Sequence, residues 1–340
     1  MQAAELLKSQ ISEGLIKGAC AIKGSTSGVE EIICCGEADY LRGTPMSVDS
    51  VFDIASISKV FGVTTLLLHC RAKNLLDFDE QLGKYLPELS DKATSRITLR
   101  QLATHYSGLD NSKPYNKYIG DAAALYKAIF QVEPVTAAGT RFEYSCVNFI
   151  LLGFVVERLL RQSLKRAARE FVFKPLGMKH SFWGSVPDAL HENLVRMYNA
   201  EPGVISDESA RGLFPAHIAG NAGIFTSGAD AALYCRALLM AGRHEANPAL
   251  VEHETFLAAA DEIFTCCSPD GMMKRSVGWG YGDQAGFSPE VIYHSGWSGQ
   301  TVWIDRKLNK FVIVFSNRVG DWAQAKQARL DFAGAWVNEK

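Results

Sequence analysis

The first part of the chain shows a helical and then an extended pattern of apolar positions. Leu7, Ile11 and Leu15 recur at the spacing of one face of an α-helix. The stretches "ACAIK" and "EEIICCG" then alternate around turn residues at 25–28. This pattern predicts a helix that is followed by a β-hairpin.

The last part of the chain predicts the same two elements in the opposite order. "TVWID" and "KFVIVFSN" are extended stretches that flank the polar turn "RKLNK". Trp322, Ala325, Phe332 and Trp336 then mark a final amphipathic helix. An antiparallel sheet assembled from both ends of the chain, with the terminal helices covering it, would explain this symmetry.

The centre of the chain is mainly helical. Helical spacing occurs in five segments that are separated by loops rich in Gly, Pro and Asp: 99–103, 122–130, 147–160, 164–173 and 229–241. We therefore predict an α/β (α+β) fold. Residues 1–74 and 276–340 are predicted to form a sheet domain and residues 75–275 a mainly helical domain. The active site is expected between them, because domain junctions are preferred positions for pockets.

Composition and charge narrow the classes of partner. The 340 residues are 47% hydrophobic and 21% charged, as in a packed globular protein of about two domains. Lys and Arg total 35 and Asp and Glu total 37, so the formal net charge is -2. No basic run could follow a phosphate backbone, and we do not expect nucleic acid as a partner.

Two features argue against a membrane partner and against export. The longest apolar run, residues 149–156, is far shorter than the roughly 20 residues that span a bilayer. The opening stretch "MQAAELLKSQ" carries Glu5 early and has no positive region that leads into an apolar block. These features predict a cytoplasmic protein, whose oligomeric state the sequence leaves open.

The cysteines and histidines do not form a metal pattern. The eight cysteines include two adjacent pairs but no Cys-x-x-Cys, so we expect mostly small buried side chains in a reducing compartment. His191, His244 and His253 each precede a glutamate, but none has the second histidine of a zinc-protease helix. No phosphate-binding loop or dinucleotide fingerprint occurs. We predict no metal and no cofactor.

The stretch "FDIASISKVFG" carries the first candidate chemistry. Ser56 and Lys59 are three residues apart and would share one face of a helix, whereas Ser58 would point elsewhere. This spacing is typical of a serine nucleophile with a lysine partner. A helix N-cap serine followed by a surface lysine has the same spacing, so the pair needs support from the rest of the chain.

Three further stretches supply that support. "FEYSCVNFILLG" places Tyr144 just before a helix, "YHSGWSGQTVWID" places His294, Ser295 and Gly296 at the start of a strand, and "GNAGIFTSGAD" forms a Gly-rich loop over 220–227. With the Ser-x-x-Lys stretch, these segments resemble the serine β-lactamase and penicillin-binding protein superfamily. The similarity is to its class C-like branch, which includes many carboxylesterases.

The resemblance covers nearly the whole chain. It also includes "TLRQLATHYSGL", "PLGMKHSF", "SVGWGYG" and "WIDRKLNKFVIVFSNR". It implies a β-lactamase/transpeptidase-like fold and an active site built from three motifs. In this sequence they correspond to Ser56 and Lys59, to Tyr144, and to His294, Ser295 and Gly296. Cys146 departs from the pattern, because Asn is usual at that position of the second motif.

The chemistry asks for the same residue types. A serine hydroxyl is a weak nucleophile until a base takes its proton, and free Lys and Tyr are protonated at neutral pH. Lys59 and Tyr144 can share one proton, and the sequence leaves open which of them holds it. The backbone amides of Ser56 and Trp297 are candidate donors to the oxyanion, and the Trp297 side chain is expected to line the acyl pocket.

Three neighbouring residues are given structural roles. His105 is expected to be a hydrogen-bonded structural histidine. Asn148 cannot replace the missing asparagine, because two residues along a helix amount to about 200° of rotation away from Cys146. Cys146 itself is expected to be a packed side chain rather than a second nucleophile.

The favoured function is hydrolysis of a small-molecule carboxylic ester through an acyl-serine intermediate. His294 replaces a permanently charged lysine that would pair a substrate carboxylate, and Cys146 cannot offer the amide that would bind an acyl amide. One alternative is a β-lactamase or a D-amino-acid-specific peptidase. Another is a protein that binds penicillin-like acyl ligands without turnover.

Overall fold

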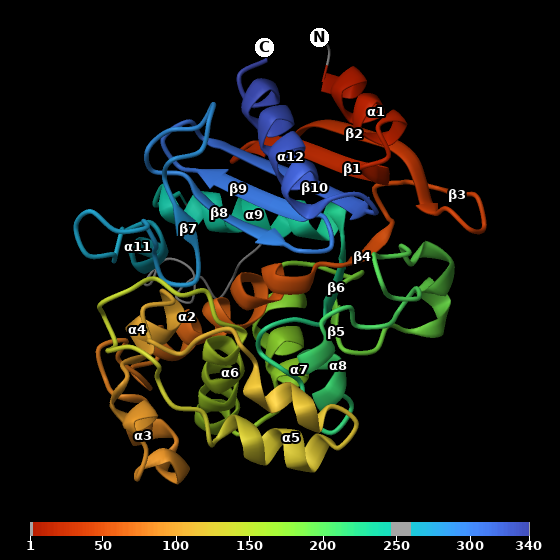
Figure 1. The fold of residues 1–340 in the computed structure, drawn as a ribbon. Helices are drawn as coiled ribbons and strands as arrows, with labels where there is room; N and C mark the ends of the chain where they lie inside the picture. Colours follow the sequence, from red (N-terminus) through yellow and green to blue (C-terminus); the bar gives the residue numbers. More distant parts are fainter. Residues whose placement is uncertain (1–2, 246–259, 340) are drawn as a thin grey trace.

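The computed structural model describes residues 3–245 and 260–339, and its main feature is a seven-stranded antiparallel sheet (Figure 1). The strand order is β3-β2-β1-β10-β9-β8-β7. The strands are β1 (Ile16–Ser25), β2 (Gly28–Asp39), β3 (Thr44–Pro45), β7 (Gly280–Tyr281), β8 (Ile292–Gly296), β9 (Gln300–Asp305) and β10 (Lys310–Arg318). The two ends of the chain meet where β1 pairs with β10, which confirms the predicted sheet.

Helices cover both faces of this sheet. The terminal helices α1 (Ala3–Ser12) and α12 (Trp322–Trp336) lie on the outer face, and α9 (Gly228–Gly242) lies on the inner face (Figure 1). The N-terminal helix is shorter than its apolar spacing suggests, because Leu15 lies beyond its end. α9 comes from the central part of the chain but contacts β1 and β10, so the division into two domains stays a prediction.

Most of the other described helices form the part of the molecule below the sheet in Figure 1. They are α2 (Thr65–Ala72), α3 (Leu82–Tyr85), α4 (Leu99–Ala103), α5 (Ala122–Ile129), α6 (Cys146–Leu160), α7 (Leu164–Ala168) and α8 (Glu208–Leu213). The short α11 (Ala260–Ile263) instead lies beside the sheet and contacts α9. The first eleven residues of α6 are all buried, as expected for a helix that is apolar on every side. α6 therefore forms the centre of this part and contacts α2, α4 and α7.

A small second sheet connects the two parts. Its strand order is β4-β6-β5, with β4 (Val51–Asp53), β5 (Phe182–Trp183) and β6 (Ile224–Ser227). The prediction of one Gly-rich loop over 220–227 is wrong for its second half, because residues 224–227 pair with β4 and β5. β4 leads directly into the Ser56 segment, so this sheet fixes where that segment begins.

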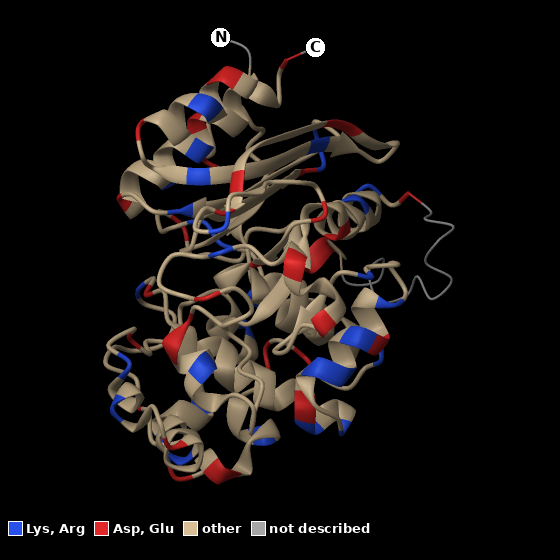
Figure 2. Ribbon diagram, turned by 90° about the vertical axis from the view of Figure 1, so that its right-hand side faces the viewer, with Lys and Arg blue, Asp and Glu red and all other residues tan. Residues whose placement is uncertain are grey.

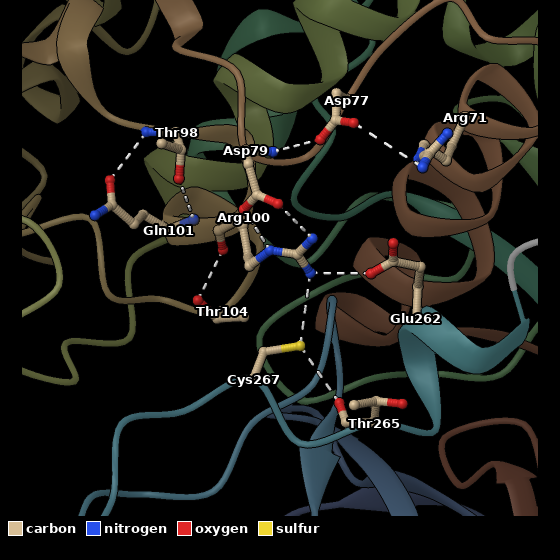
Figure 3. A network of polar contacts seen from close by, with 10 residues as sticks. All are labelled: Arg71, Asp77, Asp79, Thr98, Arg100, Gln101, Thr104, Glu262, Thr265 and Cys267. Atoms are coloured by element: carbon tan, nitrogen blue, oxygen red, sulfur yellow. Dashed lines mark hydrogen bonds and ion pairs between the residues drawn. The ribbon is translucent and has the colours of Figure 1, made fainter.

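Arg100, in α4, joins two segments that are distant in the sequence (Figure 3). Its Nε and Nη2 donate to the carboxylate of Asp79 at 2.7 and 3.0 Å, and its Nη1 donates to Glu262 at 2.9 Å. Two parallel bonds to one carboxylate hold a guanidinium in a fixed orientation. This cluster anchors the loop that continues to Arg275, a residue close to the candidate active site.

Charged residues of both signs are distributed over the molecule. Lys and Arg alternate with Asp and Glu along the ribbon, and no continuous basic stripe is seen on the face in Figure 2. No described helix is long and apolar enough to cross a membrane.

Cys20, Cys70, Cys146 and Cys235 are buried, and all eight cysteines are free thiols. No group of three or more potential metal ligands occurs among the described residues, which exclude His253.

Candidate active site

Ser56 is the single accessible residue in a long buried segment. Every residue from Val51 to Cys70 is buried except Ser56, which is half-buried. Ser56 lies in a 3-10 turn (Ala55–Ile57), and Lys59 begins a π-helical segment (Lys59–Thr64) that continues into α2. The predicted regular helix is therefore wrong in type. The two side chains still meet, because positions three apart superimpose in a 3-10 turn.

Asp53 holds the turn that carries Ser56. Ala55 has a φ of 45°. This left-handed conformation is energetically unfavourable for any residue other than glycine. The carboxylate of Asp53 accepts hydrogen bonds from the amides of Ala55 at 2.9 Å and Ser206 at 2.7 Å. Complete burial raises the pKa of Asp53 above its usual value. No local pattern in the sequence predicts this role, because the Ser206 contact joins distant segments.

Lys59 is fully buried and faces Ser56. Its Nζ donates to Ser56 Oγ at 3.0 Å and to the carbonyl oxygen of Asn221 at 2.9 Å, and lies 3.7 Å from Cys146 Sγ. Ser58 instead accepts a hydrogen bond from the Ile224 amide at 3.0 Å. The structure thus brings together the serine, the lysine and the cysteine, and it turns Ser58 away as expected.

The surroundings of Lys59 favour its charged form. Burial alone would lower the pKa of the Lys59 ammonium, but interactions with Cys146, Tyr144 and Asp207 outweigh burial, so the pKa is raised. Asp207 is held by Asn221, whose Nδ2 donates to Asp207 Oδ1 at 3.0 Å. These interactions therefore favour the protonated form of Lys59.

Tyr144 lies between Lys59 and two histidines. Lys59 Nζ is 5.3 Å from the centre of the Tyr144 ring. The centre of the His105 ring is 4.4 Å from that of Tyr144, with the two planes tilted by 35°, and the centre of the His294 ring is 6.4 Å away. Tyr144 is half-buried and immediately precedes the N-cap of α6. These contacts fix the plane of the phenol beside the Lys59 ammonium.

His105 holds the segment that contains Tyr144 and Ser145. Its Nδ1 accepts a hydrogen bond from the Ser145 amide at 3.2 Å and lies 3.1 Å from Asn148 Nδ2. Asn148 Oδ1 accepts a hydrogen bond from the Ser107 hydroxyl at 2.8 Å. The Asn148 carboxamide therefore contacts Ser107 and His105 rather than Lys59. These contacts agree with a structural role for His105 and with the expectation that Asn148 does not replace the missing asparagine.

The third motif ends a strand rather than beginning one. His294, Ser295 and Gly296 are the last three residues of β8, and Trp297 lies in the following turn. A Cβ added to Gly296 would lie 2.7 Å from the carbonyl oxygen of Ile54. The absence of a side chain at Gly296 therefore lets β8 approach the turn that carries Ser56.

His294 is buried, and its surroundings favour the neutral ring. Burial, followed by the positive charges of Arg275 and Lys59, lowers its pKa well below the usual value. Its Nδ1 lies 3.1 Å from the Ser295 carbonyl oxygen, and its Nε2 is buried without a partner in the described chain. Arg275 is a buried cation that the sequence did not suggest, although it immediately precedes the "SVGWGYG" stretch.

Trp297 has an exposed side chain and a fixed backbone. The side chain is 39% exposed and meets Tyr198 edge to face at 5.3 Å. Arg318 Nε donates to the Trp297 carbonyl oxygen at 3.0 Å, and the guanidinium carbon lies 4.6 Å from the indole. Ser295 points to the other face of the sheet, where its hydroxyl accepts from Thr301 at 3.2 Å.

The two buried histidines predict a pH dependence of stability. The pKa of His105 is also well below its usual value, chiefly because of burial and then because of Arg275 and Lys59. A lowered pKa in the folded state means that stability is present above about pH 6.5 and is lost as the pH falls, because only the unfolded chain takes up the proton. Each histidine should contribute a loss of about 1.4 kcal/mol between neutral pH and pH 5.5.

The variant His105→Gln tests this dependence. Urea unfolding at pH 7.5 and 5.5 should show a pH-dependent loss of stability that is smaller than wild type by about 1.4 kcal/mol, since one of the two groups is gone. An unchanged difference between the two pH values would show that folding does not lower the pKa of His105.

Comparisons with known proteins decide the family. The profile of the Beta-lactamase family matches residues 24–335. The chain belongs to the beta-lactamase family. Its resemblance to that superfamily, expected from the three motifs, is confirmed, and the chain is a serine hydrolase.

Relatives of this beta-lactamase-family chain differ in their names. It is 26% identical to the N-acetylmuramyl-L-alanine amidase of Bacillus subtilis (strain 168), over 82% of this chain and 70% of the relative. It is 24% identical to a putative D-alanyl-D-alanine carboxypeptidase of Escherichia coli (strain K12), over 79% and 69%.

Solved structures with the same fold also differ in activity. EstCE1, described as a hydrolase with promiscuous acyltransferase activity, matches 98% of this chain and 97% of its own length, with a TM-score of 0.79 and 20% identity. A class C beta-lactamase from Rhodobacter sphaeroides matches 98% and 99%, with a TM-score of 0.77 and 20% identity. These matches establish the fold and leave the substrate open.

Proposed function

We propose that this protein hydrolyses carboxylic esters through an acyl group on Ser56. The observation that carries the choice of substrate is the buried His294, whose Nε2 has no hydrogen-bond partner within the described residues and whose lowered pKa favours the neutral ring, where a lysine would provide a permanent charge. A neutral group does not pair the carboxylate of a β-lactam or a peptide. Cys146 supports the same choice, because a thiol next to Lys59 cannot bind an acyl amide as a carboxamide does.

In the first half of the proposed reaction, Ser56 Oγ forms a bond to the ester carbonyl carbon. The Lys59 and Tyr144 pair is proposed to hold a single proton at rest, on the Lys59 side that its raised pKa favours, so the pair can receive the proton of Ser56. The amides of Ser56 and Trp297 are the proposed donors to the oxyanion. The Trp297 amide makes no hydrogen bond within the described chain.

In the second half, the tetrahedral intermediate collapses. The ester C–O bond breaks, and the pair returns its proton to the leaving alkoxide. Water then attacks the acyl carbon and passes a proton to the side of Tyr144 and His294. The bond between Ser56 Oγ and the acyl carbon breaks, that proton returns to Ser56 Oγ, and the carboxylic acid leaves. No cofactor takes part in these steps as proposed, and the substrate is a small acyl compound.

A substrate panel tests the proposal. Rates should be measured on p-nitrophenyl esters, on nitrocefin and on a D-alanyl-D-alanine peptide. We expect turnover of the esters at the highest kcat/KM. Faster turnover of the peptide would instead favour the activity in the name of the Escherichia coli relative. Labelling without any product release would favour a binding protein.

Cys146→Asn should shift the selectivity of the site. The carboxamide would add a donor and an acceptor beside Tyr144 that an acyl amide can use and a simple ester largely cannot. One neutral hydrogen bond contributes about 0.5 to 1.5 kcal/mol, so the ratio of β-lactam to ester kcat/KM should rise roughly two- to tenfold. Both substrates must be measured on both proteins, with folding checked by thermal melting.

A cysteine reagent provides the control for this variant. Blocking the Cys146 thiol adds bulk without a donor, so it should lower both rates without raising the ratio. If the ratio falls or stays unchanged in a well-folded Cys146→Asn protein, Cys146 only packs, and the preference for esters depends on His294 or on the shape of the pocket.

A further inference from the structure

A cavity lies on the helical part of the molecule, and Ser56 does not line it. Its volume is about 660 Å³, within the range of small-molecule sites. It is lined by α7, the segment that follows it, and β5, and α7 and β5 lie side by side in Figure 1. None of the residues that form the candidate active site lines it.

The cavity combines an apolar floor with a basic rim. The floor contains Phe173, Met178, Phe182, Trp183, Val186 and Pro187. The rim contains four exposed cations and no carboxylate: Lys165, Arg169, Lys174 and Lys179. Lys165 donates to the Ser185 hydroxyl at 3.0 Å, and none of the four forms an ion pair in the described chain. The positive charge of the rim is therefore uncompensated.

We propose that this cavity binds an amphipathic organic anion, namely an alkyl chain that ends in a carboxylate. The chain would cover the aromatic floor, which removes apolar surface from water. The carboxylate would lie among the lysines and Arg169, which are donors suited to it. A small inorganic anion would leave the floor wet, and an uncharged lipid would leave the rim without a partner.

The floor of this cavity contacts the segment that carries Lys59. The Trp183 ring packs directly against Gly62, where a Cβ would collide with it. Trp183 Nε1 also donates to the Ala222 carbonyl oxygen at 2.9 Å, next to Asn221, whose carbonyl binds Lys59. A ligand that shifts Trp183 would thus act on two of the segments that position Lys59, and we expect it to change the rate of ester hydrolysis.

Calorimetric titration with decanoate tests the binding. The Ser56→Ala protein is titrated, so the result does not depend on whether the proposed hydrolysis is correct. We expect one equivalent of decanoate to bind, at least about tenfold more tightly than decanol, which lacks the charge, and than acetate, which lacks the chain.

Charge reversal locates the site. The double variant Lys174→Glu and Lys179→Glu should weaken decanoate binding about tenfold or more, because two attractive charges become repulsive. The matched double variant Lys117→Glu and Lys127→Glu changes the net charge equally, at exposed positions outside the cavity, and should leave the affinity within about twofold.

Three results would overturn the proposal. They are no binding of decanoate, equal weakening by the two double variants, and retention of the protein on anionic phospholipid vesicles without binding of free decanoate. In wild type, decanoate should also change the rate of p-nitrophenyl acetate hydrolysis. The decanoate concentration that gives half of this change should match the dissociation constant from calorimetry. A rate change that persists in the Lys174→Glu and Lys179→Glu protein would show that decanoate acts at the active site instead.

Discussion

Ser56→Ala is expected to lower kcat/KM for p-nitrophenyl esters by roughly 10⁴-fold or more. The substitution removes the hydroxyl that is proposed to form the acyl bond and that accepts a hydrogen bond from Lys59 Nζ at 3.0 Å. Ser56 is half-buried and its hydroxyl accepts a single hydrogen bond from Lys59, so the melting temperature should change little. Steady-state rates and thermal melting measure the two effects on one sample.

Ser58→Ala is the matched control. Ser58 is two residues away and fully buried, and its hydroxyl accepts from the Ile224 amide. Its loss leaves a buried donor unsatisfied, which costs about 1–3 kcal/mol of stability, while the Lys59 and Ser56 pair is retained. Ser58→Ala should therefore lose stability and keep activity, the reverse of Ser56→Ala. If the two variants lost activity equally, the defect would be in the turn rather than in the nucleophile.

Lys59→Arg should be nearly as damaging as Lys59→Ala, with a loss of roughly 10³-fold or more in kcat for each. An arginine stays charged and cannot pass a proton to Tyr144 and take it back. The larger guanidinium must also fit between Ser56, Cys146 and the Asn221 carbonyl. Rates on p-nitrophenyl esters for both variants measure this loss.

The comparison between the two variants separates charge from proton transfer. Activity of Lys59→Arg within about tenfold of wild type, which is roughly 1.4 kcal/mol of barrier, would mean that Lys59 acts by its charge and that another group is the base. Urea unfolding of both variants shows whether each is folded.

Local sequence patterns predicted most of the elements. Helical spacing located α5, α6 and α9 to within about two residues, and alternation located the β1–β2 and β9–β10 hairpins of the large sheet. These elements were predictable because each buries one face, or all faces, of a regular structure. The type of the Ser56 segment was not, because its π-helical turn depends on distant side chains. The Val60 carbonyl accepts from Thr65 at 2.9 Å and from Tyr234, in α9, at 3.1 Å.

The same division holds for the candidate site. Ser56, Lys59 and Tyr144 stand in short motifs with recognisable neighbours, and the structure brings them together. Asp53, Asn221 and Arg275 act through contacts to segments more than a hundred residues away, or through burial alone. A single sequence contains no local signal for such contacts. Asn221 lies in the stretch 220–227, which was predicted to be a Gly-rich loop, but its carbonyl oxygen and not its side chain binds Lys59.

The position of the acyl group tests the central claim most directly. The protein is mixed with a slowly hydrolysed p-nitrophenyl ester, quenched in acid during turnover, and its intact mass and proteolytic peptides are measured. The account predicts one acyl group on wild type, located on Ser56, and none on Ser56→Ala. An acyl group on another residue, such as Cys146, or ester turnover by Ser56→Ala at the wild-type rate, would contradict it.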